Sequence, residues 1–214
     1  MLEKINNELT ENASVFFRYL FNHLTLCLYT ILIATVIGVT FGVIAGKHKK
    51  LGSAIVNIAN FLHMIPTIAL LALLMPFIGI GRVPALVAMA VAAIPVQIIN
   101  TRSGLLHIEH HILEAARGCG MGRFRCLLSI EIPLALPMIF TGFRTSLIQT
   151  IYAATIAAFI GSTSLGTYIF TGFYGGVTTR HLLLIGSASI AILTLLVDLI
   201  MNLIQKRINC RFIA

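Results

Sequence analysis

The chain contains 214 residues, of which 58% are hydrophobic and 10% are charged, and its mean hydropathy is +0.97. Soluble domains contain about 25% charged residues, so this composition excludes an ordinary soluble protein and predicts a single all-α domain that is integral to a membrane. The formal net charge of +8 does not indicate nucleic acid as a partner, because the basic residues form short clusters beside apolar runs.

The first 23 residues are predicted to form a segment that lies at the membrane interface. Residues 1–12 are mostly polar and lack the charged start, apolar middle and cleavage site of a signal peptide. Residues 13–21 mix aromatic and apolar side chains with Arg18. This pattern is typical of an amphipathic helix, here expected on the outer leaflet before the first crossing.

Residues 24–205 are predicted to form the transmembrane domain, with five crossings. A crossing helix needs about 20 apolar residues, and runs of about this length lie at 24–46, 55–78, 83–100, 133–160 and 182–204. Dividing residues 133–173 into two helices would give six crossings, which is the alternative topology. The remaining residues, 206–214, form a basic tail.

The distribution of basic residues predicts the orientation, since loops on the inner side of a membrane are enriched in Lys and Arg. If the loop after the first crossing is cytoplasmic, ten basic residues lie inside: Lys47, Lys49, Lys50, Arg102, Arg117, Arg123, Arg125, Lys206, Arg207 and Arg211. Four lie outside: Lys4, Arg18, Arg82 and Arg180. The N-terminus is therefore predicted outside the cell and the C-terminus in the cytoplasm.

Between the third and fourth crossings, residues 101–132 form a long charged stretch. A helix is expected from Gly104 through Ala116, followed by a glycine-containing turn. A second helix is expected from Arg123 to Pro133, where the fourth crossing begins, because proline fits the first turn of a helix.

This stretch is predicted to be a hairpin that binds a soluble partner. Glu114 and Arg117 are the expected polar contacts, and the small Ala115 and Ala116 allow a partner surface to approach closely. Gly120 is expected to permit the turn between the two helices. The alternative is a solvated loop whose charges only face water.

Two other segments are candidates for lining or gating a pathway. Pro66, with Met64 beside it, should kink the second crossing, and a kinked helix is tolerated where neighbours or a cavity satisfy the freed carbonyl. At the outer end of the fourth crossing, Gly161 begins a small, polar segment, and Phe159 and Ile160 would close a gate there by apolar contact. A purely structural kink and an ordinary helix-ending turn are the alternatives.

Arg144 and Asp198 lie within predicted crossings. Ionisable groups in a membrane span are costly, and they pair with one another or face water. Their comparable depth favours an Arg144–Asp198 ion pair, and contact with a substrate or a proton is the alternative.

The sequence contains no motif for catalysis or for a metal ion. A G-x-x-x-x-G-K-[ST] phosphate-binding loop and an H-E-x-x-H motif are both absent, and the four cysteines follow no metal-ligand spacing. Glu109, His110 and His111 are interpreted as a charged helical surface. The chain is therefore not expected to be an enzyme, and any energy for its activity should come from another chain.

The residues Glu114-Ala115-Ala116, Gly120 and Ile130-Glu131-Ile132-Pro133 resemble the EAA loop of ABC importer permeases, with Ile132 in place of the usual leucine. The chain is similar to binding-protein-dependent ABC permeases over about residues 20–205. Within that group it resembles the permeases for quaternary-ammonium solutes such as glycine betaine, carnitine and choline. Further segments of this resemblance are residues 64–72, 79–85, 142–146 and 159–161.

The resemblance implies a type I permease core in a bacterial inner membrane, with residues 101–132 as the hairpin that docks on an ABC ATPase dimer. ATP and magnesium would bind that partner, with no cofactor in this chain. A separate extracytoplasmic solute-binding protein and a second permease chain, identical or paralogous, would complete the transporter in the lipid bilayer. Methionine or another amino-acid-like compound is the alternative solute. An ion-coupled secondary transporter and a membrane scaffold are alternatives of different classes.

Overall fold

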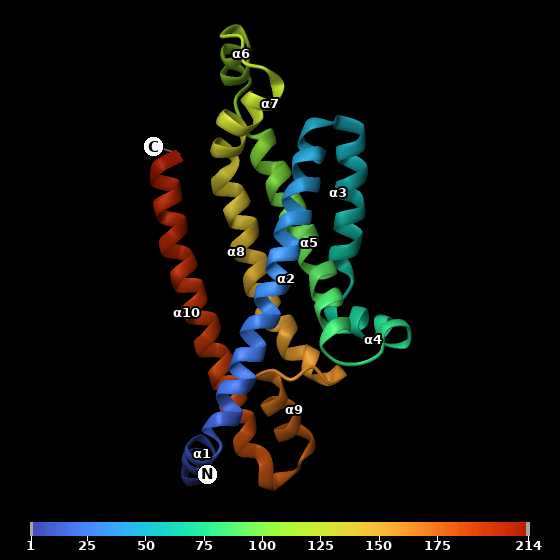
Figure 1. Cartoon of the computed structure of the whole chain (residues 1–214), viewed down its shortest axis with the longest axis vertical. Helices are drawn as coiled ribbons and strands as arrows, with labels where there is room; N and C mark the ends of the chain where they lie inside the picture. Colours follow the sequence, from blue (N-terminus) through green and yellow to red (C-terminus); the bar gives the residue numbers. More distant parts are fainter. Residues whose placement is uncertain (1, 213–214) are drawn as a thin grey trace. The chain divides into compact units, whose positions relative to one another are not determined.

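The computed structural model describes residues 2–212, and within this range the chain forms helices joined by short turns, with no strand (Figure 1). The α-helices are α1 (Leu2–Glu11), α2 (Ala13–Lys47), α3 (Lys49–Met64), α4 (Thr67–Ile78), α5 (Arg82–Leu106), α6 (His110–Gly118), α7 (Arg123–Cys126), α8 (Ile132–Ile156), α9 (Gly166–Tyr174) and α10 (Arg180–Phe212). A π-helical turn, η1 (Leu127–Glu131), joins α7 to α8, and two short 3-10 helices are η2 (Ala157–Ile160) and η3 (Val177–Thr179).

Four segments of the described chain are long and apolar enough to cross a membrane: Ala13–Lys47, Arg82–Leu106, Arg123–Ile160 and Val177–Cys210. The predicted second crossing is different, because α3 and α4 pass the same test only together and are bent by 92° at the break between them. Five crossings result if this bent pair is one broken span. The six-crossing alternative is not supported, because α9 has nine residues and a crossing helix needs about 20.

The residues divide into two compact units, which we describe separately. Unit 1 comprises the chain up to Ile33, with Ile65–Ala93 and Leu147–Asp198, and unit 2 comprises Ala34–Met64, Ile94–Ser146 and the chain from Leu199. The four long helices α2, α5, α8 and α10 each contribute residues to both units. Helix α5 is the most enclosed of the four candidate spans, with 61% of its apolar window buried, whereas the value for the span that contains α10 is 17%.

Unit 1 has a continuous apolar core of small and aliphatic side chains. Leu26 of α2, Leu71 of α4, Met89 of α5 and Ile151 of α8 are each at most 2% exposed in it. The expected interfacial helix at residues 13–21 is helical, but no break separates it from the first crossing. It forms the first turns of α2, and Phe16 packs against the core of unit 1. A separate helix, α1, precedes it.

Unit 2 is held together by close approach of α2 and α5. Three glycines of α2 spaced four residues apart face three residues of α5 with the same spacing; they are Gly38, Gly42 and Gly46 opposite Gln97, Thr101 and Leu105. A Cβ atom added at Gly42 would come within 2.5 Å of the Thr101 Cβ, so only glycine fits. Small residues at such intervals let helix backbones pack closely in a membrane.

A buried polar contact adds to this packing in unit 2. The Nε2 group of Gln97 donates a hydrogen bond to Ser146 Oγ of α8 at 2.8 Å, and Ser146 Oγ donates in turn to the Gly142 carbonyl at 2.7 Å. Gln97 and Ser146 are both 0% exposed. Neither side chain can bond to water instead, so these hydrogen bonds help to hold the neighbouring helices together.

Two helix boundaries around the charged stretch differ from those expected. The helix predicted from Gly104 through Ala116 is interrupted, since α5 ends at Leu106 and α6 begins at His110. At this break the Ser103 carbonyl accepts hydrogen bonds from both the backbone N–H and the Nδ1 of His107, at 3.1 Å and 2.7 Å.

The expected helix end at Pro133 is also wrong. The helical segment continues without a break from η1 into α8, because the π-helical turn changes the hydrogen-bond register. Helix α8 begins at Ile132, one residue before the predicted start of the fourth crossing at Pro133. The Ile132 N–H donates to the Leu127 carbonyl, five residues earlier. The proline, which has no N–H, is accommodated directly after this turn.

Candidate functional site

The candidate site is the hairpin of residues 110–126, formed by α6, the turn after it and α7, which we call the α6–α7 hairpin (Figure 1). Helix α6 presents Glu114, Ala115 and Arg117 to solvent, whereas Ala116 on the opposite face is buried. The Glu114 carboxylate lies 3.1 Å from Nδ1 of His110, one turn earlier. The α6 residues predicted to bind a partner are therefore brought together on one short helix, with three of the four exposed.

The turn after α6 depends on a left-handed glycine. Gly120 has φ +76°, a conformation that costs other residues about 1–2 kcal/mol. The Cys119 N–H donates to the Ala115 carbonyl at 3.0 Å, and the Met121 N–H donates to the Ala116 carbonyl at 3.1 Å. These bonds satisfy the last carbonyls of α6 and reverse the chain, as glycine-ended helices commonly do. Gly120 thus makes the turn, as the sequence predicts.

At the base of the hairpin, Lys47 forms an ion pair with Glu131. Lys47 is the last residue of α2, and Glu131 is the last residue of the π-helical turn η1. The Glu131 side chain is 7% exposed and the Lys47 side chain is 36% exposed. A buried carboxylate needs such a partner, because an isolated charge is costly to remove from water. The pair connects the end of the first crossing with the base of the hairpin.

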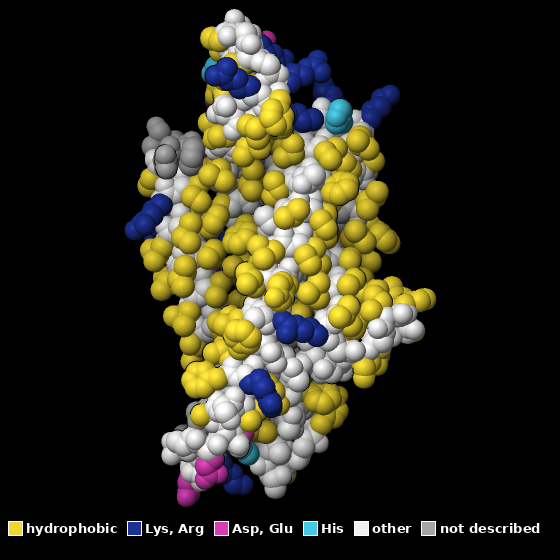
Figure 2. Space-filling model, viewed as in Figure 1, with side chains coloured by type: hydrophobic (Ala, Val, Ile, Leu, Met, Phe, Trp, Pro, Cys, Tyr) yellow, Lys and Arg dark blue, Asp and Glu magenta, His cyan; other side chains and the backbone are white. Residues whose placement is uncertain are grey.

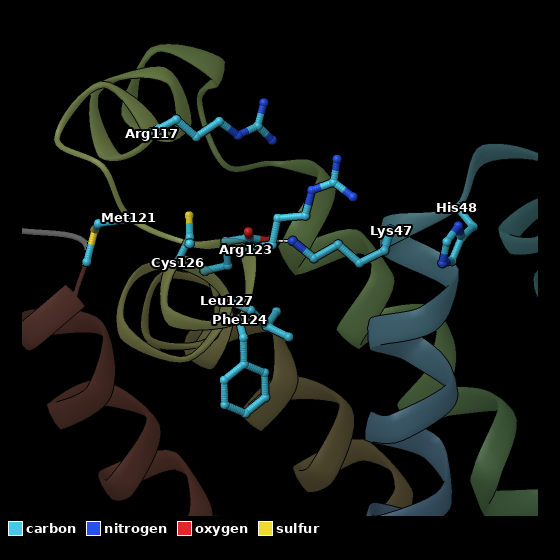
Figure 3. A pocket seen from close by; sticks show the side chains of 10 residues that line it. Lys47, His48, Arg117, Met121, Arg123, Phe124, Cys126 and Leu127 are labelled. Atoms are coloured by element: carbon cyan, nitrogen blue, oxygen red, sulfur yellow. Dashed lines mark hydrogen bonds and ion pairs between the residues drawn. The ribbon is translucent and has the colours of Figure 1, made fainter.

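A cavity of about 790 Å³ opens beside this ion pair. We call it the basic cavity, and it is lined by Lys47, His48, Arg117, Met121, Gly122, Arg123, Phe124, Cys126, Leu127 and Glu131. In Figure 3 a dashed line from Lys47 marks this ion pair, and the guanidinium groups of Arg117 and Arg123 lie above it. Figure 2 shows Lys and Arg side chains gathered around the hairpin and the α2–α3 turn of unit 2. The surface at this end is therefore strongly basic.

The first pair of predicted pathway residues lies at the break between α3 and α4. Met64 ends α3 and is 79% exposed, and Pro66 is the residue that precedes the first turn of α4. A bend at this proline was expected, but it is sharper than a kink, because α3 and α4 are separate helices at 92° to each other. That these residues line a pathway stays a prediction.

The other three predicted pathway residues lie together in unit 1. Phe159 is 47% exposed, and its ring packs against Phe170 with 5.2 Å between ring centroids. Ile160 is buried, and its carbonyl accepts a hydrogen bond from the Gly81 N–H at 2.7 Å. Gly161 has φ +80° and ends the 3-10 helix η2.

The segment after Gly161 is more firmly held than its small, polar sequence suggests. The buried Ser164 Oγ donates to the Ala154 carbonyl at 2.9 Å, and the Asn22 side chain donates to Thr163 Oγ1 at 3.0 Å. A gate role for Phe159, Ile160 and Gly161 stays a prediction.

The predicted Arg144–Asp198 pair also stays a prediction, because the two residues belong to different units. Within unit 2, the Arg144 guanidinium donates to Gln205 Oε1 of α10 at 2.9 Å, and Gln205 Nε2 donates to Thr141 Oγ1 at 2.8 Å. This contact between α8 and α10 was not predicted.

Among residues 2–212, no three metal-ligating side chains lie in an arrangement that could hold a metal ion. The Nδ1 of His111 lies 3.1 Å from the Glu109 carboxylate, and both side chains are exposed. The four cysteines of the chain are free thiols, with Cys119 and Cys210 exposed and Cys27 and Cys126 buried. Cys119 lies at the tip of the turn after α6, which makes it a useful chemical handle.

The ion pair between Lys47 and Glu131 could not be predicted from the sequence. They are 84 positions apart in the chain, and Lys47 appeared only as one of a basic cluster that sets orientation. Glu131 did carry a signal, because it is an acidic residue between two isoleucines directly before a proline. Its burial was a reasonable expectation from that context, but its partner was not.

The sequence matches the family model described as "Binding-protein-dependent transport system inner membrane component" over residues 38–212. The choline transport system permease protein OpuBB of Bacillus subtilis is 31% identical over 189 residues, which is 88% of this chain and 86% of that protein. The osmoprotectant import permease protein OsmW of Salmonella typhimurium is 34% identical over 200 residues, which is 91% of this chain and 92% of that protein.

Solved structures show the same fold. A chain of the inward-facing MetNI methionine ABC transporter matches with a TM-score of 0.85 at 22% identity, covering 92% of this chain and 98% of that one. An amino acid ABC transporter crystallised with histidines matches with a TM-score of 0.75 at 20% identity, covering 94% of this chain and 97% of that one. The predicted all-helical type I permease fold is thus confirmed, and the chain belongs to the family of inner membrane components of binding-protein-dependent transport systems.

Proposed function

We propose that this chain is the membrane-spanning subunit of an ATP-driven importer for a small quaternary-ammonium solute. The relatives that match most of its length carry the names of choline, glycine betaine, carnitine and osmoprotectant permeases. The solved structures of methionine and amino acid transporters are less than 25% identical to this chain. They therefore support the fold, but they do not support those solutes.

The observation that best supports this role is the α6–α7 hairpin. It presents Glu114, Ala115 and Arg117 on an exposed helix, and Gly120 closes the turn behind them. We assign this helix to docking on an ABC ATPase subunit. Because α8 follows α7 and the π-helical turn without a break, a force on the hairpin would be transmitted directly to a membrane-crossing helix.

The remaining parts of the proposed transporter follow from this assignment. The hairpin lies in the cytoplasm with the C-terminus, and the N-terminus lies outside. Two such chains, identical or paralogous, form the pathway, and a separate binding protein delivers the solute from outside. ATP and magnesium bind the two ATPase subunits, and this chain contributes no ATPase site.

In this proposal, closure of the ATPase dimer on ATP draws the two hairpins together and favours the outward-open state. Hydrolysis releases them and returns the transporter to the inward-open state. Each ligand shifts the equilibrium only as far as it binds one state better than the other. The docking contacts of the hairpin must therefore differ between the two states.

The direct test is uptake by the whole transporter in liposomes, with its cognate ATPase and binding protein. Radiolabelled choline, glycine betaine, carnitine and methionine are compared, with ATP enclosed on the hairpin side. We expect ATP-dependent accumulation of a quaternary-ammonium solute and none without the ATPase.

The same assay separates the alternatives. Accumulation of methionine alone would replace the proposed solute and leave the importer role intact. Uptake that needs no ATPase and collapses with the ion gradient would identify a secondary transporter, and the proposal would then be wrong.

A further inference from the structure

The basic cavity has more positive than negative charge among its lining residues. It is lined by Lys47, Arg117 and Arg123, and by one carboxylate, that of Glu131. Because Lys47 and Glu131 form an ion pair with each other, the two guanidinium groups remain without a carboxylate among the lining residues. Two arginines facing one cavity attract an anion.

The chemistry of the two arginines favours a phosphate group. A guanidinium presents several N–H donors in a planar fork that matches phosphate oxygens, and such charge-assisted hydrogen bonds are stronger than neutral ones. His48 also lines the cavity and offers a further hydrogen-bonding nitrogen. The volume of about 790 Å³ lies in the range of pockets that bind small molecules.

The position of the cavity indicates where such a phosphate would come from. Its walls include Lys47 at the end of α2 and Arg123 at the start of the candidate span Arg123–Ile160. Phe124 also lines the cavity and is 74% exposed, and Leu128, in the next turn, is 50% exposed. Basic groups beside exposed apolar side chains at a span end are typical of a membrane interface, and basic pockets between membrane helices bind anionic headgroups.

We propose that the basic cavity binds the phosphodiester headgroup of an anionic phospholipid, held by Arg123 and by Arg117, a residue that the proposed contact with the ATPase shares. The acyl chains would leave past Phe124 and run along exposed apolar side chains of the span, such as Leu134, which is 37% exposed. A lipid in this place would contact both the end of α2 and the base of the hairpin. The proposal concerns a second ligand and is independent of the identity of the transported solute.

The test counts lipids bound to the purified whole transporter by native mass spectrometry. The transporter is titrated with phosphatidylglycerol and with phosphatidylcholine of the same acyl chains. We expect a clear preference for phosphatidylglycerol, and we expect Arg123→Ala to weaken its binding about fivefold, the equivalent of one basic contact at a membrane surface. Arg123→Lys, which keeps the charge and loses the planar fork, should bind phosphatidylglycerol more tightly than Arg123→Ala and less tightly than the unchanged chain.

Arg125→Ala is the matched control, because Arg125 is an exposed residue of the same short helix and is not among the residues that line the cavity. It should leave phosphatidylglycerol binding unchanged. Equal binding of the two lipids, or equal weakening by Arg123→Ala and Arg125→Ala, would overturn the proposal. Displacement of phosphatidylglycerol by millimolar inorganic phosphate would assign the cavity to a free anion and overturn the lipid assignment. Lipid binding is measured without transport, so a negative result leaves the proposed importer role untouched.

Discussion

At the scale of single residues, the Lys47–Glu131 ion pair gives an asymmetric prediction. Lys47→Ala leaves a buried carboxylate without its partner, whereas Glu131→Gln leaves an amide opposite a lysine that is 36% exposed and can reach water. Since an unpaired buried charge is costly, we expect Lys47→Ala to lower the free energy of unfolding by about 1–3 kcal/mol and Glu131→Gln to lower it by less. Thermal unfolding of the purified transporter measures both.

The exchanged pair, Lys47→Glu with Glu131→Lys, serves as the control for this interaction. In a double-mutant cycle the double variant should lose less stability than Lys47→Glu and Glu131→Lys lose in total, because the attraction is restored. If the losses of the two single charge reversals simply add in the double variant, the ion pair does not stabilise the hairpin base.

At this scale the sequence predicts a residue that acts through its own backbone, but it does not predict a residue that acts through a distant partner. Gly120 could be placed in the turn because glycine is a poor helix former, and the structure adds that its φ is positive. Lys47 and Glu131 were not paired, and Gln205 was not recognised as a partner of Arg144. Such contacts are set by how helices pack, and no local pattern specifies which side chains then face each other.

At the scale of elements, the hairpin turn offers two glycines with different requirements. A Cβ at either Gly118 or Gly120 would meet open space, but only Gly120 has a positive φ. We therefore expect Gly120→Leu to destabilise the turn by about 1–2 kcal/mol. The yield of co-purified ATPase and the rate of transport should both fall. Gly118→Leu, at the end of α6, should retain both.

If Gly118→Leu and Gly120→Leu reduce ATPase co-purification and transport equally, docking depends on side-chain size at the turn and not on the backbone conformation of Gly120. Glu114→Arg is a second probe, because it reverses a charge on the exposed face without touching the turn. Normal assembly and transport with both Gly120→Leu and Glu114→Arg would remove the hairpin from docking.

The close contact of α2 with α5 gives a prediction about stability. Gly42→Leu cannot be accommodated at 2.5 Å from the Thr101 Cβ, so the helices must separate, and we expect at least about 1–3 kcal/mol of destabilisation. Val36→Leu, at a position of α2 that is 68% exposed, is the control and should be neutral. The midpoint of thermal unfolding compares the two, and equal midpoints would contradict the packing.

The starts of the third, fourth and fifth crossings could be predicted because hydropathy decides them, and each lies within two residues of the start of α5, α8 or α10. The ends of α5 and α10, at Leu106 and Phe212, lie beyond the predicted ends at 100 and 204. The interruptions could not be predicted. The proline at 66 breaks a span that was expected only to kink, whereas the proline at 133 breaks nothing, because a π-helical turn precedes it. The outcome at a proline depends on which neighbours satisfy the freed carbonyl, and this is a property of the packed structure.

At the scale of the whole molecule, the proposed contact with the ATPase requires the orientation that the positive-inside bias predicts. Cys119 is an exposed thiol at the hairpin turn, and Cys210 is the other exposed thiol. In a Cys210→Ser chain, a membrane-impermeant maleimide should label Cys119 in inside-out vesicles and leave it unlabelled in intact cells. Labelling from outside intact cells would reverse the topology and remove the hairpin from the cytoplasm.

The proposed role of this chain requires that the α6–α7 hairpin contacts the ATPase subunit, and a photo-crosslinker at Cys119 can detect this contact. The Cys210→Ser transporter, labelled at Cys119 with benzophenone maleimide, is illuminated in the membrane and the adducts are identified by mass spectrometry. We predict an adduct between this chain and the ATPase subunit, with a yield that changes when ATP is added, because the docking contacts differ between the two states. Adducts only with lipid or with the solute-binding protein, in a transporter that still hydrolyses ATP and imports its solute, would contradict the proposed contact.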